Sequence, residues 1–228
     1  MSSPATTRTS VYRDRVLRIP SGRFAIEPHS KRVLDLLAAT TGLVLSAPAW
    51  LLIATAIKLD DGGPIFFRQE RMGKDGRLFD AIKFRTMVPA LDGTRIPPRG
   101  HPDESLITRV GRFLRPTALD ELPQLLNILR GNMSLVGPRP LSPIELDWSG
   151  EPVDLRNLPG FRERHRVRPG LTGPAQVRAS RDISYRRKFR YDVFYVRHRS
   201  LLYDLRLIVQ SFLISVGGRW PHVGAKQR

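Results

Sequence analysis

The chain has 228 residues, a length that fits one domain with a modest hydrophobic core. Lysine and arginine number 38 against 21 aspartates and glutamates, a formal net charge of +17, which predicts a polyanionic partner, either nucleic acid or an anionic membrane surface. Cysteine is absent, which excludes disulfide bonds and thiolate metal sites.

Residues 1–30 are rich in Ser, Thr, Arg and Pro and show no sustained hydrophobic period. We interpret them as a mobile basic arm. Their arginines could contact lipid headgroups, although a solvated tail is the simpler interpretation. No pattern in this arm is typical of catalysis.

The longest apolar segment runs from Val33 to Ile57 and is interrupted by one charge, Asp35. It is long enough to span a bilayer, for which about 20 apolar helical residues suffice. Pro48 lies near its middle, where it must kink a helix. The flanks are equally basic, with seven Lys and Arg in residues 1–32 and seven in residues 58–85, whereas a spanning helix usually has unequal flanks. The segment favours a membrane partner over nucleic acid, and a hairpin that enters and leaves by the cytoplasmic face.

A cleaved signal peptide and a straight signal anchor are the alternatives to this hairpin. The apolar run starts late and exceeds the roughly 7–15 apolar residues of a signal-peptide core, which argues against the first alternative. Each arm of a hairpin broken at Pro48 is shorter than the roughly 17 residues needed to cross a bilayer. This argues for re-entry, while a straight anchor remains open.

The segment from Pro64 to Met87 predicts two strands joined by a turn at residues 73–76, Gly-Lys-Asp-Gly. Its polar and basic side chains could simply form the polar faces of the strands. After it, residues 88–105 are predicted to be a surface loop, and residues 107–114 a short amphipathic helix. The polar and basic residues of the strand unit are Arg68, Gln69, Arg71, Lys83 and Arg85.

An adjacent acidic pair, Asp120 and Glu121, precedes a short predicted helix. Pro123 marks the first turn of that helix because proline is tolerated only there, and Gly131 marks its end. Carboxylates in this position commonly cap free N–H groups and stabilise the helix by about 0.3–1 kcal/mol each. The buried stripe is predicted to consist of Leu122, Leu125, Ile128 and Leu129.

Two arginines flank the acidic pair and indicate a role for it beyond helix capping. Arg115 precedes the pair by five residues, and Arg139 lies in a Gly-Pro-Arg-Pro turn whose prolines fix the backbone. The planar fork of arginine suits bidentate capture of phosphate. Acids, a helix N-terminus and fixed arginines together predict phosphoryl chemistry.

The last third of the chain is predicted to be a basic run, a loop and two helices. In the run at residues 162–168, a lone histidine, His165, is expected at the surface, and residues 169–174 read as a turn-rich loop. Residues 184–197 and 201–216 show helical periods. One of these helices either packs on the core or lies in the membrane interface, where Trp220 would also fit.

Several segments of this chain resemble motifs of the bacterial sugar transferases, which are monotopic phosphoglycosyl transferases, and they occur in the same order as in that family. These enzymes move a phosphosugar from a nucleotide diphosphate sugar to a polyprenyl phosphate. The resemblance covers roughly residues 31–219. The segments are Pro64-Ile-Phe-Phe-Arg-Gln-Glu-Arg-Met-Gly73, Lys83-Phe-Arg-Thr-Met87, the whole stretch from Arg115 to Pro140, Arg168-Pro-Gly-Leu-Thr-Gly173 with Gln176-Val177, and Tyr191-Asp192 through Tyr195 to Ser200 and Asp204.

The resemblance implies an α+β, mostly helical fold, with a small single catalytic domain, an N-terminal re-entrant membrane helix hairpin and a small β-hairpin. We expect residues 31–58 to be the re-entrant helix, residues 59–219 the catalytic domain and residues 220–228 a tail. The family breaks its membrane helix at a Ser-Pro pair. This chain has Ala47-Pro48 there, with Ser46 one position earlier.

The resemblance also implies a covalent mechanism in which Asp120 is the nucleophile and forms an aspartyl-phosphosugar intermediate. Glu121 would assist the acceptor or, with Asp120, hold Mg²⁺. The implied partners are a nucleotide sugar, expected to be a UDP-sugar, a polyprenyl phosphate and anionic membrane lipids, with no nucleic acid and with homo-oligomerisation open. The implied substrate-binding residues are Arg115, Arg139, Gln69, Arg71, Lys83 and Arg85.

Such an enzyme would initiate cell-surface glycan assembly from the cytoplasmic face of the bacterial inner membrane. The alternative is a basic, membrane-anchored protein that binds lipid or nucleic acid without catalysis. That alternative explains the charge and the apolar segment, but not the ordered motifs around Asp120.

Overall fold

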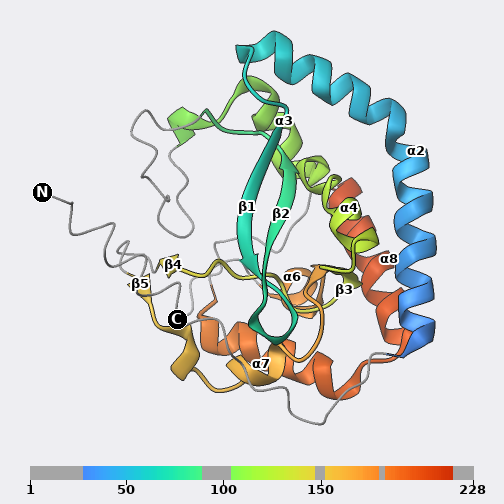
Figure 1. Ribbon diagram of the computed structural model, residues 1–228, viewed down its shortest axis with the longest axis vertical. Helices are drawn as coiled ribbons and strands as arrows, with labels where there is room; N and C mark the ends of the chain where they lie inside the picture. Colours follow the sequence, from blue (N-terminus) through green and yellow to red (C-terminus); the bar gives the residue numbers. More distant parts are fainter. Residues whose placement is uncertain (1–27, 89–103, 147–151, 180–182, 218–228) are drawn as a thin grey trace, which may run out of the picture.

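The computed structural model describes residues 28–88, 104–146, 152–179 and 183–217. Within them the chain is mostly helical and forms three two-stranded sheets, which confirms the predicted α+β class (Figure 1). Residues 1–27, 89–103 and 220–228, predicted as an arm, a loop and a tail, lie outside this description. The helices and strands in chain order are α2 (His29–Asp61), β1 (Phe66–Met72), β2 (Leu78–Phe84), α3 (Arg109–Thr117), α4 (Gln124–Leu129), β3 (Ser134–Val136), β4 (Glu145–Leu146), β5 (Pro152–Val153), α5 (Phe161–Arg164), β6 (Gly170–Thr172), α6 (Pro174–Arg178), α7 (Tyr185–His198) and α8 (Leu201–Gly217).

The apolar segment forms one helix of 33 residues, α2, with Pro48 inside it. Figure 1 shows that α2 changes direction near its middle, as expected where a proline removes a backbone hydrogen bond. Ser46 supplies a hydroxyl beside this bend despite the Ala47 departure: its Oγ lies 3.4 Å from the carbonyl oxygen of Leu43 and accepts from Trp50 Nε1 at 3.0 Å. The predicted break is confirmed as a bend, and the re-entrant path through a membrane stays a prediction.

Most of the apolar surface of α2 is exposed. Of its most apolar 18-residue stretch only 11% is buried, and α2 is the one helix among the described residues that is long and apolar enough to cross a membrane. Burying this surface in lipid would stabilise it by the hydrophobic effect, so α2 indicates membrane association. The most exposed large side chains are Leu37, Val44, Leu45, Leu51, Leu52 and Leu59.

Strands β1 and β2 form the predicted antiparallel hairpin, from the pair Phe66 and Phe84 to the pair Met72 and Leu78. Residues 74–76 form the turn, in which Asp75 adopts a left-handed backbone with φ 55°. At the open end, the Trp50 ring meets the edge of the Phe84 ring at 5.2 Å between centroids. This contact attaches the hairpin to the second half of α2.

Helix α4 packs between α2 and β2, and its predicted apolar stripe is confirmed. Leu125 and Ile128 are buried together with Ala39 of α2 and Met133, while Leu122 and Leu129 pack at the edge of the same cluster. The helix ends before Gly131, whose φ of 81° is the left-handed conformation that glycine adopts readily.

The predicted loop at residues 169–174 is wrong in part, because residues 170–172 form strand β6 parallel to β3. The two backbones approach so closely that a Cβ on Gly170 would lie 2.0 Å from the backbone nitrogen of Gly137. Glycine is required there for lack of space. The stretch after Pro140, for which the sequence indicated no strand, carries the short strands β4 and β5.

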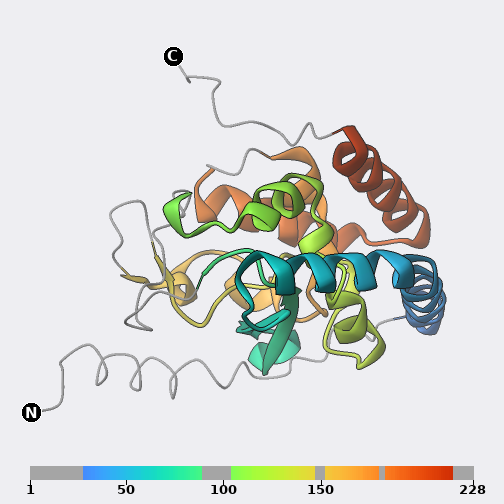
Figure 2. The same cartoon turned by 90° about the horizontal axis from the view of Figure 1, so that it is seen from above.

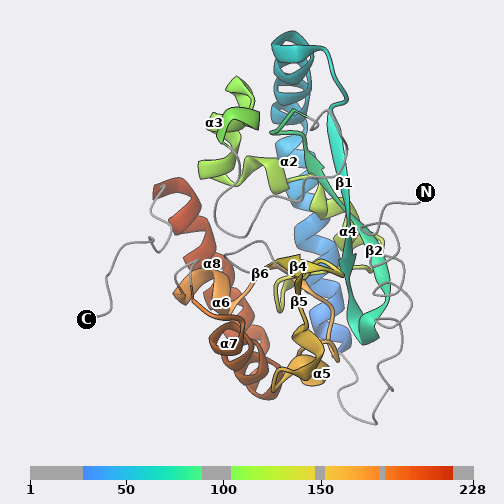
Figure 3. The same ribbon diagram turned by 90° about the vertical axis from the view of Figure 1, so that its left-hand side faces the viewer.

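The two predicted C-terminal helices are confirmed as α7 and α8, and Figures 2 and 3 show α8 on the opposite side of the molecule from β1 and β2. Helix α7 buries one face in the core. Helix α8 buries Asp204 and Leu207, whereas its apolar residues Leu202, Val209, Phe212 and Leu213 are all more than half exposed. Packing on the core therefore does not account for these exposed apolar residues of α8. The other predicted position, in the membrane interface, fits them better.

Candidate active site

The acidic pair lies in a tight turn between two helices. Helix α3 ends at Thr117 and is followed by its C-cap residue Ala118, a non-glycine residue with φ 56°; residues 119–121 then form a single 3₁₀ turn before α4 begins. The position of the pair beside the N-terminus of α4 is as predicted. However, the N-cap residue of α4 is Pro123, and no side chain caps it, so helix capping does not account for the two carboxylates.

Glu121 is held by two basic side chains from distant segments. Lys83 of β2 places its Nζ 2.5 Å from Glu121 Oε1, and Arg139, beyond β3, places its Nη2 3.6 Å from the same oxygen. Within the described residues, no hydrogen bond or ion pair occupies the carboxylate of Asp120. One carboxylate of the pair is therefore engaged and the other is available to a ligand.

The two carboxylates have opposite pKa shifts. Partial burial raises the pKa of Asp120 to about 6, although the charge of Lys83 opposes this and the charge of Glu121 adds to it. Burial would also raise the pKa of Glu121, but the positive charges of Lys83 and Arg139 outweigh it and hold that pKa well below its usual range. At pH 7 Glu121 is fully ionised and Asp120 is roughly nine-tenths ionised.

A chain of buried groups fixes the backbone of the Arg139 turn. Arg164 of α5 donates from Nη2 to the carbonyl oxygen of Arg139 at 2.6 Å and from Nε to Asp192 Oδ2 of α7 at 2.9 Å. Both Arg164 and Asp192 are almost completely buried. Sequence reasoning missed Arg164, although Asp192 belongs to one of the motifs that carried the resemblance.

His165 is buried, so its predicted surface position is wrong. Burial first, and the neighbouring charge of Arg164 second, lower the pKa of His165 to about 3, so the ring is neutral at pH 7. Its Nδ1 lies 2.7 Å from the carbonyl oxygen of Phe161 and its Nε2 lies 3.2 Å from Arg164 Nη1. The neutral ring therefore donates from Nδ1 and accepts from Arg164, which fixes the guanidinium that holds the Arg139 turn.

The remaining predicted site residues divide into two groups. Arg71 hydrogen-bonds to Gln69, lies 3.4 Å from the carbonyl oxygen of Pro140 and pairs with Glu145 at 3.6 Å. Arg115, in the last turn of α3, acts on the pair through its charge, which lowers the pKa of Asp120. Arg85 instead pairs with Asp61 at the end of α2, so the structure does not bring it to the acidic pair.

A small pocket opens beside the acidic pair. Its wall contains three of the predicted basic residues and Gln124, a buried polar residue that sequence reasoning missed because it lies on the helix face expected to pack. Cationic donors around a partly enclosed space suit a phosphate or diphosphate group. The lining residues are Arg71, Ala81, Lys83, Glu121, Gln124, Arg139, Pro140, Gly170 and Leu171.

A divalent cation would find two protein carboxylates at this position. The described residues contain no cluster of three or more His, Asp or Glu side chains that could hold a metal by themselves. Magnesium commonly binds through one or two carboxylates and completes its shell with water and substrate phosphate oxygens. Asp120 and Glu121 fit that donor set, provided that a phosphate ligand is present.

Comparison with known families decides what kind of protein carries this site. The family described as bacterial sugar transferase matches residues 26–218. The chain belongs to the bacterial sugar transferase family. It is therefore an enzyme, and the alternative of a non-catalytic binding protein is set aside.

Relatives of this sugar transferase have related names and cover most of its length. A UDP-glucose:undecaprenyl-phosphate glucose-1-phosphate transferase of Caulobacter vibrioides is 42% identical, over 84% of this chain and 71% of the relative. The uncharacterized sugar transferase EpsL of Bacillus subtilis is 40% identical, over 82% and 89%. The exopolysaccharide production protein ExoY of Rhizobium meliloti is 38% identical, over 85% and 89%.

Proposed function

We propose that this sugar transferase moves a sugar phosphate from a nucleotide diphosphate sugar to a polyprenyl phosphate, with Asp120 as the nucleophile. The observation that carries the proposal is the pairing of Asp120, whose carboxylate has no hydrogen bond or ion pair with another described residue, with Glu121, which Lys83 and Arg139 hold. The names of the relatives from Caulobacter vibrioides and Escherichia coli support UDP-glucose and undecaprenyl phosphate as the substrate classes to test first.

The reaction divides into two displacements at one phosphorus atom. In the first, an oxygen of Asp120 attacks the phosphorus that bears the sugar, the bond to the bridging oxygen breaks, and nucleoside monophosphate leaves. In the second, a phosphate oxygen of the polyprenyl phosphate attacks that phosphorus, which releases the Asp120 carboxylate and forms a polyprenyl diphosphate sugar. Covalent catalysis of this kind replaces one difficult transfer with two easier ones.

The opposite pKa shifts suit the two carboxylates to different roles. Asp120 is mostly ionised at pH 7, and among the described residues no cation contacts its carboxylate, so one of its oxygens is available for attack. Glu121 is tied to Lys83 and orients that ammonium. Lys83, Arg139, Arg71 and Arg115 supply the positive charge that would stabilise the phosphate oxygens of the transition state.

Mg²⁺ would be held by Asp120 and by Oε2 of Glu121, since Lys83 and Arg139 both contact Oε1, together with the diphosphate of the substrate. The ion would neutralise phosphate oxygens and orient them, which two polyanionic substrates and an anionic nucleophile require. Gln69 and Gln124 would contribute uncharged polar groups to substrate binding. Arg85, paired with Asp61, would act on the substrate only after leaving that pair.

We further propose that α2 re-enters the membrane and places the site on the cytoplasmic face of the inner membrane. The bend at Pro48 and the exposed apolar surface of α2 support this path. Tags near residue 20 and at the C-terminus are expected on the cytoplasmic side, and Pro48→Leu is expected to favour a straight span. Wild-type tags on opposite sides would contradict re-entry.

The proposed function is tested by trapping the covalent intermediate. The protein is mixed with a labelled UDP-sugar and Mg²⁺ without polyprenyl phosphate, and its intact mass is measured. Wild type is expected to gain one phosphosugar, whereas Asp120→Asn is expected to gain none, because an amide cannot form the acyl phosphate. Asp154→Asn is the matched control, since it makes the same change at a carboxylate that pairs with Arg156.

The outcomes separate the nucleophile from a helix cap. Burial disfavours the ionised form of Asp120, so an uncharged Asn is expected to leave the protein folded and no less stable at pH 7. An adduct that persists in Asp120→Asn, or normal transfer by that variant, would remove Asp120 from the mechanism. Wild-type transfer without any adduct would replace the covalent route with a direct one.

A further inference from the structure

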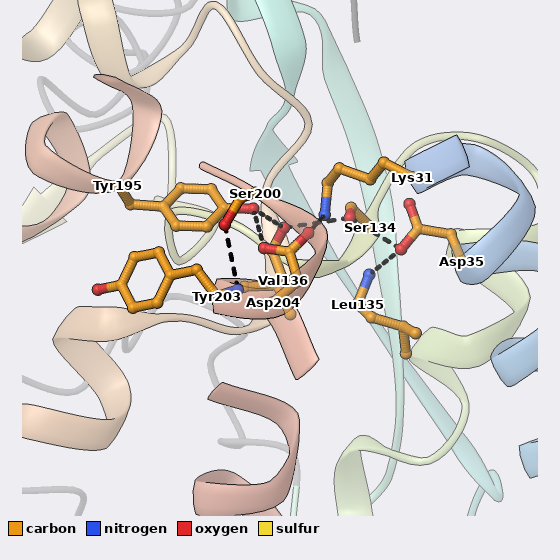
Figure 4. Close-up of polar contacts among 9 residues, drawn as sticks. All are labelled: Lys31, Asp35, Ser134, Leu135, Val136, Tyr195, Ser200, Tyr203 and Asp204. Carbon is orange, nitrogen blue, oxygen red and sulfur yellow. Dashed lines mark hydrogen bonds and ion pairs between the residues drawn. The ribbon is translucent and has the colours of Figure 1, made fainter. Parts of the chain in front are cut away.

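A second group of charged residues is buried away from the acidic pair, between α2, β3 and α8 (Figure 4). Lys31 and Asp204 form an ion pair of 2.8 Å with side chains 5% and 1% exposed. Asp35, one turn after Lys31 on α2, is 1% exposed. Burying charges costs free energy unless they are paired and hydrogen-bonded, so their partners identify what the group holds in place.

The partners of Asp35 lie on strand β3. Its Oδ1 accepts from Ser134 Oγ at 3.0 Å and from the backbone N–H of Leu135 at 2.9 Å. On the opposite side of the strand, the Tyr195 hydroxyl of α7 lies 3.1 Å from the carbonyl oxygen of Val136. Figure 4 shows these groups converging on the strand from both sides.

Asp204 connects these two sides. Its Oδ1 accepts from the Tyr195 hydroxyl at 2.7 Å while its Oδ2 accepts from Lys31. The start of α2, strand β3, α7 and α8 therefore share one hydrogen-bonded network.

Arg32, on the same turn of α2, holds a different element. Its two terminal nitrogens donate to the carbonyl oxygens of Ile128 and Leu129 at 2.7 and 3.0 Å. These carbonyls are among the last of α4, which lack partners within the helix. Arg32 thus caps the C-terminus of the helix that follows the acidic pair.

These contacts place both flanks of the site on the first two turns of α2. Strand β3 leads through Gly137 and Pro138 to Arg139, and α4 begins three residues after Glu121. An apolar interface between α2 and its neighbours could be as stable, but it would define their relative position less strictly. Buried hydrogen bonds are directional and form only when α2, β3 and α4 lie in one arrangement.

We infer that Lys31, Arg32 and Asp35 are positioning residues that fix α2 to α8, α4 and β3 respectively and thereby set the placement of Arg139 relative to Asp120 and Glu121. We name this set of three residues the helix joint. The inference rests on the proposed function for its effect on turnover, and on the contacts alone for its effect on local structure. It assigns to the start of the membrane helix a role in the chemistry as well as in anchoring.

The first test compares substitutions on one helix turn. Asp35→Ala removes the acceptor for Ser134 and Leu135, whereas Asp35→Asn keeps an oxygen that can accept both bonds. Leu37→Ala is the matched control because Leu37 lies on the same helix and is 64% exposed. We expect single-turnover release of nucleoside monophosphate, at saturating UDP-sugar, to fall at least tenfold in Asp35→Ala and less than threefold in the other two. Equal rates in Asp35→Ala and wild type, at equal folded fraction, would overturn the inference.

The second test asks whether Asp35 acts through Arg139. If it does, Asp35→Ala is expected to slow an Arg139→Lys enzyme less than twofold, because the position it controls has already lost its function. A purely structural defect would multiply the two effects instead, and that result would overturn the positioning role.

Hydrogen exchange separates this inference from the proposed function. The amides of residues 134–137 and 139 are expected to exchange faster in Asp35→Ala than in wild type and Leu37→Ala, whether or not the protein turns over a UDP-sugar. Unchanged exchange at these amides would overturn the positioning role of the helix joint. An inactive wild type with faster exchange in Asp35→Ala would overturn the proposed function and, with it, the effect on turnover, while keeping the contact between α2 and β3.

Discussion

Two lysine–carboxylate pairs of similar length lie in contrasting parts of this molecule. Lys83 and Glu121 are 2.5 Å apart at the pocket, with side chains 19% and 18% exposed. Lys31 and Asp204 are 2.8 Å apart, with side chains 5% and 1% exposed. The first, which we call the open pair, lies beside Asp120, whose carboxylate has no partner among the described residues. The second, which we call the sealed pair, joins α2 to α8 and, through Asp204 and Tyr195, to α7.

The difference indicates how similar chemistry serves two purposes. Around the open pair, charges of both signs shift the pKa values of adjacent carboxylates in opposite directions and leave room for a ligand. Around the sealed pair, the same charges join three segments that are remote in sequence. Removing the lysine should therefore impair activity with little loss of stability at the first site, and lower stability, in addition to any effect on the placement of Arg139, at the second.

The largest effect is expected at the sealed pair. Lys31→Met leaves Asp204 buried without its counter-charge, which should lower the free energy of unfolding by about 3–5 kcal/mol. Chemical unfolding in lipid nanodiscs measures this. Adding Asp204→Asn removes the stranded charge and keeps an acceptor for Tyr195, so the double variant should regain at least half of the loss. A double variant as unstable as the single one would contradict an electrostatic cause.

At the open pair the corresponding change should act on catalysis. Lys83→Met is expected to lower kcat/KM for the UDP-sugar about 100-fold, equivalent to about 2.7 kcal/mol of transition-state stabilisation, with the free energy of unfolding changed by no more than about 1 kcal/mol. Steady-state transfer and chemical unfolding of the same preparations measure both quantities. A stability loss as large as that of Lys31→Met would erase the contrast between the two pairs.

The pH dependence should report the ionisation of Asp120, the proposed nucleophile. Because the pKa of Asp120 is raised to about 6 and the proposed attack needs its ionised form, the rate of adduct formation should be nearly maximal above pH 7 and fall about tenfold per pH unit below 6. Single-turnover rates from pH 5 to pH 8 measure this. An ordinary aspartate would keep its activity down to pH 5, and a flat profile there would contradict the shift.

Arg139 tests the geometry of the open site at constant charge. Arg139→Lys keeps the positive charge beside Glu121 but loses the planar fork, so kcat should fall about tenfold. The measurement is the rate of nucleoside monophosphate release at saturating UDP-sugar. Full activity of Arg139→Lys would mean that only the positive charge, and not the planar guanidinium, is needed at this position.

The smallest effect on stability is expected at a surface ion pair, which serves as a reference for the open pair and the sealed pair. Arg197 donates to Glu163 at 2.8 and 3.0 Å, but its side chain is 62% exposed. Arg197→Gln should leave the free energy of unfolding unchanged within the error of chemical unfolding, because water and salt screen the pair. A loss comparable with that of Lys31→Met would show that contact distance matters more than burial.

Local patterns determined the elements and the acidic turn. The Gly-Lys-Asp-Gly turn, the position of Pro123, the leucine spacing of α4 and the helical periods of α7 and α8 are all confirmed. These features depend on residues within about four positions of each other, so the sequence displays them directly. The resemblance added the roles of Asp120 and its neighbours, which stay predictions.

Only the tertiary structure decided which charges meet. Lys31 pairs with Asp204 across 173 positions, Asp35 meets Ser134 across 99, and Arg85 turns to Asp61 instead of the acidic pair. The structure also changes how the equally basic flanks of the apolar segment are interpreted. Lys31 and Arg85, which were counted in these flanks, are buried in ion pairs and do not face headgroups. A charged residue reads as solvated in sequence because its partner is remote along the chain, and the desolvation that makes the contact matter arises only when the chain packs.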